Sequence, residues 1–148
     1  MYNRILVAVD GGTASNLALK EAIKLTGEQH SLLRLVHIID PHILYLDVET
    51  PYVVDYQKSL EAAGEKVIAD SSAMAREAGI KFEGASIAIE RQGQRVYDAI
   101  EEEAKRWQAD LIVIGTHGRR GIGRALLGSV AEGVTRIASK PVLLIRAA

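Results

Sequence analysis

The sequence contains no cysteine, only 5% aromatic residues and no long hydrophobic run, and each of these shortages excludes a class of protein. Without cysteine the chain can form neither a disulfide nor a zinc site with thiolate ligands, which fits a reducing compartment. The apolar run at the N-terminus, 5–9, is too short for a signal peptide or a membrane span. We therefore expect a cytoplasmic protein without a membrane partner.

An excess of charge of one sign is missing as well, since 18 lysine and arginine residues face 19 aspartate and glutamate residues. A formal net charge of −1 does not indicate a nucleic-acid binder. With 148 residues and 48% hydrophobic content, the chain is long enough for one well-filled core and short for two. A single domain over residues 1–148 is expected.

Short apolar segments occur at intervals along the whole chain. A segment that alternates, 81–89, places Ala85, Ile87 and Ile89 on one side and is expected at the edge of a sheet. The other segments are nearly continuous in leucine and β-branched residues, which is typical of strands buried on both faces of a parallel sheet. These segments are 5–9, 32–39, 111–114 and 142–145.

Between these strands, apolar residues recur at helical spacing and predict helices that pack on the sheet. Strands that alternate with helices indicate an α/β fold with right-handed crossovers and helices on both faces. The segment 41–51 is interpreted as a packed loop, with a flap over a site as the alternative. The apolar stripes comprise Leu17 and Leu25; Leu60, Ala63, Val67, Ser71, Met74 and Ala78; and Val96, Ile100, Ala104 and Trp107.

A glycine-rich connection follows the strand 111–114. Each of its spaced glycines permits a positive φ or a closer approach of a ligand than a Cβ would allow. The connection ends where apolar residues begin to recur at helical spacing, and a helix N-terminus offers free N–H groups and the macrodipole to an anion. The residues of this pattern are Gly115, Gly118, Gly128 and Ser129.

The charge and length of this connection favour the same ligand. Arg119, Arg120 and Arg124 lie within it, and no acidic residue occurs from position 111 to position 131. About 13 residues from Thr116 to Gly128 make a long connection for a compact domain, and long loops are usually functional. We therefore predict that the connection binds a nucleotide phosphate.

Other interpretations of the same residues are weaker. Ser129 and Glu132 have the S-x-x-E spacing of a capping box, which would start the helix without any ligand. A Walker A loop is excluded because Arg124-Ala125 stand where lysine and a hydroxyl residue are required. A G-x-G-x-x-G dinucleotide fingerprint is absent after the first strand, which leaves hydride chemistry without support.

The spacing G-x2-G-x9-G-S resembles the nucleotide-binding signature of the universal stress protein family. The resemblance extends to the strand that ends at Asp10, to the segment His37-Ile38-Ile39-Asp40 and to the final strand after Pro141. It implies a Rossmann-like, open five-stranded parallel sheet of order 3-2-1-4-5, with ATP, ADP or AMP as the ligand, together with magnesium. In that order the first and fourth strands are neighbours, so Asp10 would lie beside Gly115.

The resemblance also implies which residues form the site. Ala8, Val9 and the main chain of Ile38 would line the adenine pocket, although many family members carry proline where Ala8 stands. Asp10 would lie near the ribose or a phosphate-bound magnesium; alternatively, it forms a turn or caps the next helix. The phosphate segment would comprise Gly115, Thr116, His117, Gly118, Arg119, Arg120, Gly121, Gly128, Ser129, Val130 and Ala131.

No residue is predicted to be catalytic or to bind a metal by itself. His117 is interpreted as a residue that shapes the loop or contacts phosphate, and His37 as a partly buried histidine of the second strand. Because the site turns contain no carboxylate besides Asp10 and no lysine, they favour binding over phosphoryl transfer.

The expected function is therefore that of a nucleotide-responsive stress or regulatory module with an unidentified protein partner. A slow ATPase or an ATP-using transferase remains the alternative, and a nucleotide-free interaction protein would leave the glycine pattern unexplained. The apolar strand 142–145 would lie at an open edge in the implied order, where strands tend to pair. A homodimer through this strand follows, and the family resemblance implies the same dimer.

Overall fold

The computed structural model describes residues 1–41, 53–117 and 127–147. The strands form one parallel sheet of order β3-β2-β1-β4-β5, which confirms the predicted fold class and the edge position of the alternating segment. The strands are β1 (Arg4–Ala8), β2 (Leu32–Ile39), β3 (Phe82–Ala88), β4 (Leu111–Gly115) and β5 (Val142–Ile145). The helices are α1 (Thr13–Gln29), α2 (Val53–Glu77), α3 (Val96–Trp107) and α4 (Ser129–Ile137).

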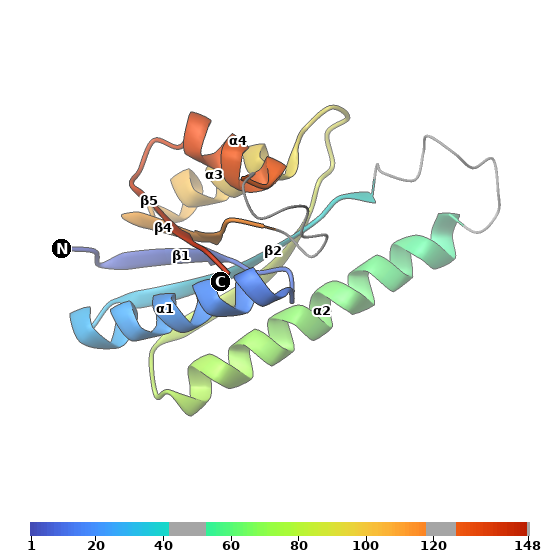
Figure 1. The fold of residues 1–148 in the computed structure, drawn as a ribbon. Helices are drawn as coiled ribbons and strands as arrows, with labels where there is room; N and C mark the ends of the chain where they lie inside the picture. The colour runs from blue at the N-terminus through green and yellow to red at the C-terminus, as the bar shows by residue number, and fades with distance from the viewer. Residues whose placement is uncertain (42–52, 118–126, 148) are drawn as a thin grey trace.

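Helices cover both faces of the sheet, with α1 and α2 on one side and α3 and α4 on the other (Figure 1). The chain runs outward from β1 to β3, returns to β4 and continues in the opposite direction to β5. Because the crossovers of parallel strands are right-handed, a change of direction moves the connecting helices to the other face. Within the described ranges, no helix has both the length and the apolar character that a membrane span needs.

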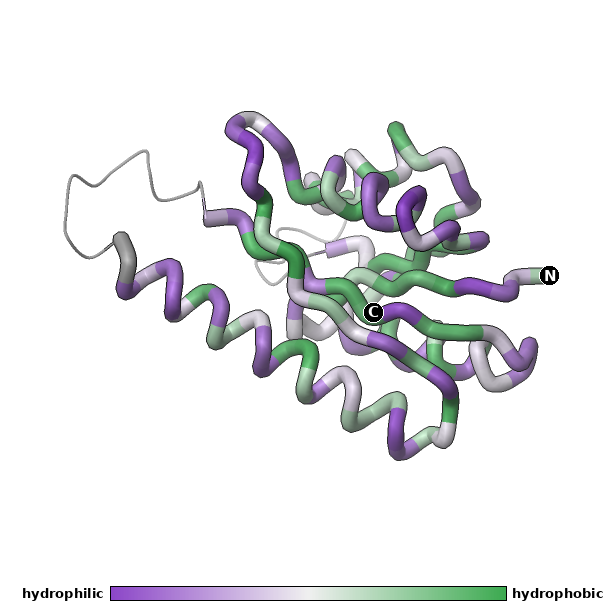
Figure 2. Tube along the Cα trace, turned by 180° about the vertical axis from the view of Figure 1, so that it is seen from behind, coloured by the Kyte–Doolittle hydropathy of each residue, from purple (hydrophilic) through white to green (hydrophobic). Residues whose placement is uncertain are grey.

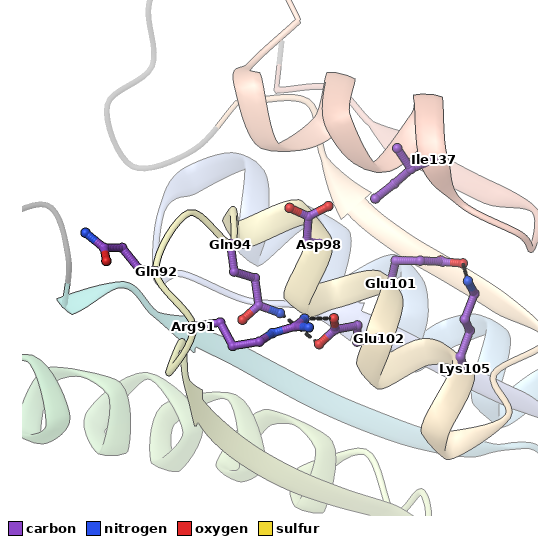
Figure 3. Close-up of a pocket in the computed structure, with 8 residues that line it drawn as sticks. All are labelled: Arg91, Gln92, Gln94, Asp98, Glu101, Glu102, Lys105 and Ile137. Carbon is purple, nitrogen blue, oxygen red and sulfur yellow. Dashed lines mark hydrogen bonds and ion pairs between the residues drawn. The ribbon is translucent and has the colours of Figure 1, made fainter.

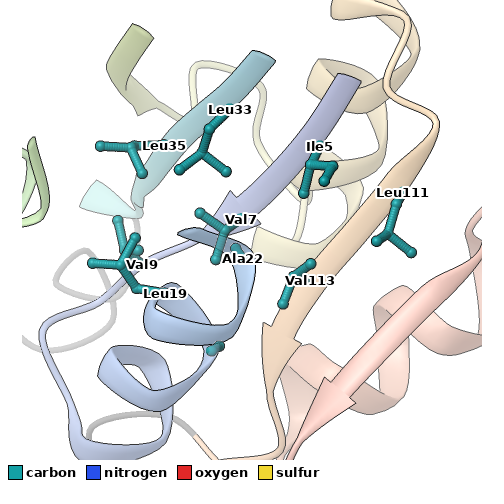
Figure 4. Packing of buried hydrophobic residues seen from close by; sticks show 10 residues of the cluster. Ile5, Val7, Val9, Leu19, Ala22, Leu33, Leu35, Leu111 and Val113 are labelled. Carbon is teal, nitrogen blue, oxygen red and sulfur yellow. The ribbon is translucent and has the colours of Figure 1, made fainter. Parts of the chain in front are cut away.

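Side chains of the central strands alternate between two apolar clusters. Ile5, Val7 and Val9 of the first strand and its extension pack toward α1 and α2, as Figure 4 shows for the cluster around them. Leu6 and Ala8 point to the opposite cluster, beneath α3 and α4. Burial on both faces explains the continuous apolar runs of the sequence, and Figure 2 shows hydrophobic residues concentrated in these strands.

The buried side of α1 differs from the predicted stripe. Leu17 and Leu25 are only partly buried, whereas small residues make most of the buried face. Small side chains allow the helix axis to approach the sheet closely. A helix prediction that follows the spacing of leucine residues does not detect a buried face made of small residues. The buried residues of α1 are Ala14, Ser15, Ala18, Leu19, Ala22 and Thr26.

The stripe predicted for α2 is also partly wrong. Ala63 is exposed, and Ala78 lies beyond the end of the helix. Gly64 and Ala75 are buried instead, because the helix crosses β2 and β3 at close range and a Cβ at Gly64 would lie 2.7 Å from the Ser86 hydroxyl. The stripe of α3 is confirmed, since Ile100, Ala104 and Trp107 are buried and Val96 partly so.

The contact between α3 and α4 depends on a glycine. A Cβ at Gly133 would lie only 2.1 Å from Cδ1 of Tyr97, whose ring covers that position. The helices can therefore approach each other only while position 133 lacks a side chain.

We expect Gly133→Ala to lower the free energy of unfolding by about 1–3 kcal/mol, because overpacking outweighs the gain in helix propensity. Urea denaturation measures this change. Gly27→Ala is the matched control in α1, because a Cβ there meets only Ile80 at 3.8 Å, and it should stabilise the protein. Equal stabilisation by both substitutions would show that Tyr97 does not restrict position 133.

Candidate functional site

A cavity of about 550 Å³ opens at the carboxyl ends of β1 and β4, where the order of the sheet reverses. Ligands of open parallel sheets bind at this place because the flanking connections leave on opposite faces. The cavity brings together most of the residues predicted for the site. These are Ala8, Val9, Asp10, Ile38, Gly115, His117, Gly128, Ser129, Val130 and Ala131.

Thr116 is buried and does not line the cavity, contrary to its predicted place in the site. Its main chain holds the two ends of the glycine-rich connection together instead. Its N–H donates to the Ile145 carbonyl at 2.9 Å, and its own carbonyl accepts from the Gly128 N–H at 2.7 Å. Gly118, Arg119, Arg120, Gly121 and Arg124 lie outside the described residues, as does segment 42–52 of the loop that was interpreted as packed.

Several lining residues were not predicted for the site. Val96 and Ile100 belong to the apolar stripe of α3, and periodicity alone cannot distinguish a cavity wall from a core contact. Ser15 lies one helical turn beyond the Asp10 turn, where the sequence offers no signal of a role. The residues missed are Ser15, Val36, His37, Val96, Ile100, Ile114 and Leu127.

Part of the cavity wall is apolar and lies on the side of α3 and α4. Val36 and Ile38 of β2 and Ala8 of β1 point to this side, since all three belong to the cluster beneath those helices. The main chain of Ile38 adds polar groups to this wall. β1 pairs with β2 only as far as Ala8, which lies opposite Val36. No residue of β1 therefore lies opposite Ile38.

The first turn of α4 also lines the cavity. The N-cap is Gly128, which forms no side-chain cap, and Ser129 is already the first residue of the helix. The capping-box interpretation of Ser129 and Glu132 is therefore wrong. Among the described residues no side chain caps this helix, and a helix start of this kind favours an anion.

Gly115 is required for a reason other than the predicted ones. Its φ is not positive, as the positive-φ glycines of the described residues are Gly11, Gly79 and Gly93. A Cβ at Gly115 would lie 2.7 Å from the carbonyl carbon of Ala14 and 2.9 Å from its Cβ. The glycine therefore lets the first turn of α1 pack directly against the end of β4.

Asp10 forms a turn and lines the cavity at the same time. Its Oδ1 accepts a hydrogen bond from the Gly12 N–H at 2.7 Å, and Gly11 between them has a φ of +82°. The turn alternative is thus confirmed for this oxygen. The carboxylate nevertheless stays at the cavity wall, beside Gly115 and the end of β4.

The two histidines at the cavity differ in their hydrogen bonding. His37 is partly buried, as predicted, and its Nδ1 lies 2.8 Å from the Val9 carbonyl. Nδ1 of His117 lies 3.1 Å from the Thr116 hydroxyl, while its buried Nε2 has no partner among the described residues. A buried imidazole nitrogen at the cavity wall is suited to contact a ligand.

A second cavity, of about 470 Å³, lies along α3 and the preceding loop (Figure 3). Its charged side chains bind one another. Arg91 and Gln94 both bond the Glu102 carboxylate, and Lys105 lies 3.7 Å from Glu101. The Glu101 carboxylate also accepts the Ser139 N–H at 3.0 Å. Oε2 of Glu101 is buried and has no partner among the described residues. The cavity at β1 and β4 is nevertheless the stronger candidate, because most of the predicted site residues gather there.

The model of the Universal stress protein family matches residues 1–146. The chain belongs to this family. Universal stress protein YxiE of Bacillus subtilis is 28% identical over 99% of the chain and 100% of its own length. Universal stress protein MJ0531 of Methanocaldococcus jannaschii is 32% identical, over 99% of the chain and 83% of its own length.

Solved structures of universal stress proteins share the fold. One from Burkholderia pseudomallei has a TM-score of 0.79 at 29% identity and covers 99% of the chain and 97% of its own. A universal stress protein in complex with cAMP has a TM-score of 0.73 at 24% identity, with 99% of both chains covered. An Arabidopsis thaliana member with AMP bound has a TM-score of 0.70 at 19% identity, covering 99% of the chain and 92% of its own.

We expect Ser129→Ala to change the free energy of unfolding by less than about 0.5 kcal/mol, because Ser129 is not the N-cap. Asp98→Ala is the matched control. The Asp98 carboxylate accepts the N–H of the N-cap residue Arg95 at 3.0 Å at the start of α3, and its loss should cost about 0.5–2 kcal/mol. Urea denaturation compares the two variants, and a loss at Ser129 as large as that at Asp98 would restore the capping role.

Proposed function

We propose that this universal stress protein binds an adenine nucleotide, ATP, ADP or AMP, in the cavity at the ends of β1 and β4. The observation that carries the proposal is that one cavity is lined both by apolar side chains, its apolar half, and by the start of α4, which has no side-chain cap among the described residues and forms its polar half. A nucleotide has the same division between its base and its phosphates. The family members solved with cAMP and with AMP support an adenine nucleotide as the ligand.

The apolar half suits the base. Ala8, Ile38 and Val96, which are partly exposed, provide a surface on which an aromatic ring can pack. The main chain of Ile38 adds a donor and an acceptor at the wall, which match the ring nitrogen and the amino group on one edge of adenine. Specificity for the base then comes from the main chain, and affinity comes from the apolar surface.

The polar half suits the phosphates. Gly128, Ser129, Val130 and Ala131 supply the start of α4, and the predicted contacts of Gly118, Arg119, Arg120 and Gly121 would complete this half. In the described part of the chain, no three His, Cys, Asp or Glu side chains are placed to share a metal ion. Magnesium would therefore be held by the phosphates themselves, with Asp10 as the neighbouring carboxylate.

This set of groups favours a nucleotide-responsive binder over an enzyme. Phosphoryl transfer requires a residue that orients water or a nucleophile, and Asp10 is the one carboxylate among the described cavity residues. Groups that hold charge equally in the ground and transition states increase affinity more than rate. We propose that the protein acts in the cytoplasm, where occupancy changes the surface that a regulatory partner recognises.

Gly128→Val should abolish ATP binding while the protein stays folded. The φ of −61° and ψ of 154° at Gly128 are open to valine, and the N–H that bonds Thr116 is retained, but the new side chain would lie at the start of α4. Isothermal titration calorimetry with ATP and magnesium measures the binding, and thermal unfolding checks the fold.

Nucleotide released by heat from the freshly purified wild-type protein should be detected by chromatography, and phosphate release should stay below about 1 s⁻¹. Unchanged ATP affinity in folded Gly128→Val would contradict the assigned phosphate site. Release of several phosphates per second would overturn the binder and favour an enzyme that turns over ATP.

We propose further that the protein is a homodimer through β5. Pro141 and Ile145 carbonyls accept the Ile112 and Thr116 N–H groups, at 3.0 and 2.9 Å. Along a parallel strand these groups alternate in direction, so the main chain of Val142 and Leu144 points to the open edge. An apolar edge of this kind is covered when a second copy pairs with it antiparallel about a two-fold axis.

Leu144→Pro should produce a monomer, because proline removes the outward N–H while the bonds to β4 are kept. Leu144→Ala is the control, since it loses the same side-chain packing and retains the N–H, and it should stay dimeric. Analytical ultracentrifugation at micromolar concentration distinguishes them. A monomeric wild type would contradict the proposed dimer.

A further inference from the structure

The ladder between β1 and β2 stops at one peptide group, Val9–Asp10. The Leu32 N–H donates to the Asn3 carbonyl at 2.9 Å, and the Val9 N–H donates to the Val36 carbonyl at 2.8 Å. In a parallel ladder with this register, the next bond would join the Ile38 N–H to the Val9 carbonyl. That bond is not among those of the described residues.

His37 takes the place of the missing donor. Its Nδ1 lies 2.8 Å from the Val9 carbonyl, and because a carbonyl oxygen can only accept, Nδ1 carries the proton. The imidazole thus satisfies the acceptor that Ile38 would otherwise satisfy. As a result the Ile38 N–H remains at the cavity wall instead of closing the ladder.

The packing of α2 keeps the imidazole in this position. Gly64 of α2 lies directly over the ring, since a Cβ there would come within 3.0 Å of Cδ2 of His37. The same absent Cβ would meet the Ser86 hydroxyl at 2.7 Å. The ring is therefore held between the end of β1 and α2. Because it cannot rotate freely, its hydrogen bond to the Val9 carbonyl is kept in place.

The other end of the same peptide group is bound by α1. The Asp10 N–H donates to the Ser15 hydroxyl oxygen at 2.9 Å, and Ser15 is 4% exposed. Side chains from β2 and α1 thus hold the carbonyl and the N–H of one peptide. Rotation of this peptide would break both bonds at once, so its orientation and the start of the Asp10 turn are fixed.

We infer that His37 and Ser15 are positioning residues for nucleotide binding, which act through the Val9–Asp10 peptide. They keep the Ile38 N–H open to the base and the Asp10 carboxylate at the cavity wall. The inference rests on the proposed nucleotide site and adds two residues that need not touch the ligand.

His37→Leu removes the donor and should raise the Kd for ATP about tenfold, a loss typical of one hydrogen bond. The vacant Val9 carbonyl should then accept the Ile38 N–H, so the exchange of the Ile38 amide in the nucleotide-free protein should slow. His37→Asn should restore binding to within about threefold of wild type, since its Nδ2 is as far along the side chain as Nδ1 of histidine. If His37 only stabilised the fold, its loss would instead speed the exchange of the Ile38 amide.

Ser15→Ala tests the peptide from the other side and removes only one oxygen, so the fold should survive. It should raise the Kd for ATP about threefold to tenfold and speed exchange of the Asp10 amide. Thr26→Val is the control in the same helix, because it removes another buried hydroxyl, bonded to the Ala22 carbonyl, and should leave the Kd unchanged.

The outcomes separate the two proposals. Wild-type protein that binds ATP, with His37→Leu and Ser15→Ala binding equally well, would overturn the positioning role and leave the nucleotide site intact. Faster rather than slower exchange of the Ile38 amide in His37→Leu would also overturn it. Wild-type protein that binds no adenine nucleotide would overturn the proposed function and, with it, the inferred role of both residues.

Discussion

The close approach of α1 to the end of β4 is the contact on which the site depends. At Gly115 a single methyl group would overlap the main chain of Ala14, so the two segments are already at their closest distance. Ala14, Ala18 and Ala22 on the buried side of α1 let the rest of the helix follow the sheet equally closely. Through this contact the turn after β1 and the connection after β4 open into one cavity rather than two.

A second constraint is the hydrogen bonding of the main chain where the sheet ends. Buried peptide groups need partners, and a ladder that stops inside the protein leaves some of them without one. At Val9–Asp10 the partners are side chains, His37 and Ser15, rather than the next strand. The polar groups of this peptide are thereby satisfied, while in the described part of the chain no residue of β1 pairs with Ile38 of β2.

Much of this architecture could be predicted from the sequence. Runs such as 5–9 and 111–114 indicated doubly buried strands, the alternation of 81–89 indicated an edge, and the glycine spacing indicated where the site lies. The strand order came from the family resemblance, because local patterns do not specify which strands are neighbours. The cavity walls at Val96 and Ile100 were missed, since the same periodicity describes a core contact.

The remaining errors have a common physical origin. Gly115 and Gly133 are needed because of what packs against them, Ala14 and Tyr97, and such contacts between distant segments leave no local mark. The same holds for Ser15, whose importance depends on a turn formed by residues before it. The S-x-x-E spacing of Ser129 and Glu132 suggested Ser129 as the N-cap, but the N-cap lies one residue earlier, at Gly128.

Two of the helices that begin at the cavity, α1 and α4, have glycine at the N-cap, Gly12 and Gly128, without a side-chain cap. Serine or aspartate at either position would satisfy an N–H of the first turn and stabilise the helix by a few tenths of a kcal/mol relative to glycine. The chain forgoes this stabilisation at both of these helix starts. In α3, whose first residue Val96 also lines the cavity, the Asp98 carboxylate instead accepts the N–H of the N-cap residue Arg95. The N–H groups left without a cap are donors that a bound anion can satisfy, so ligand binding would restore the helix stability that the missing caps leave out.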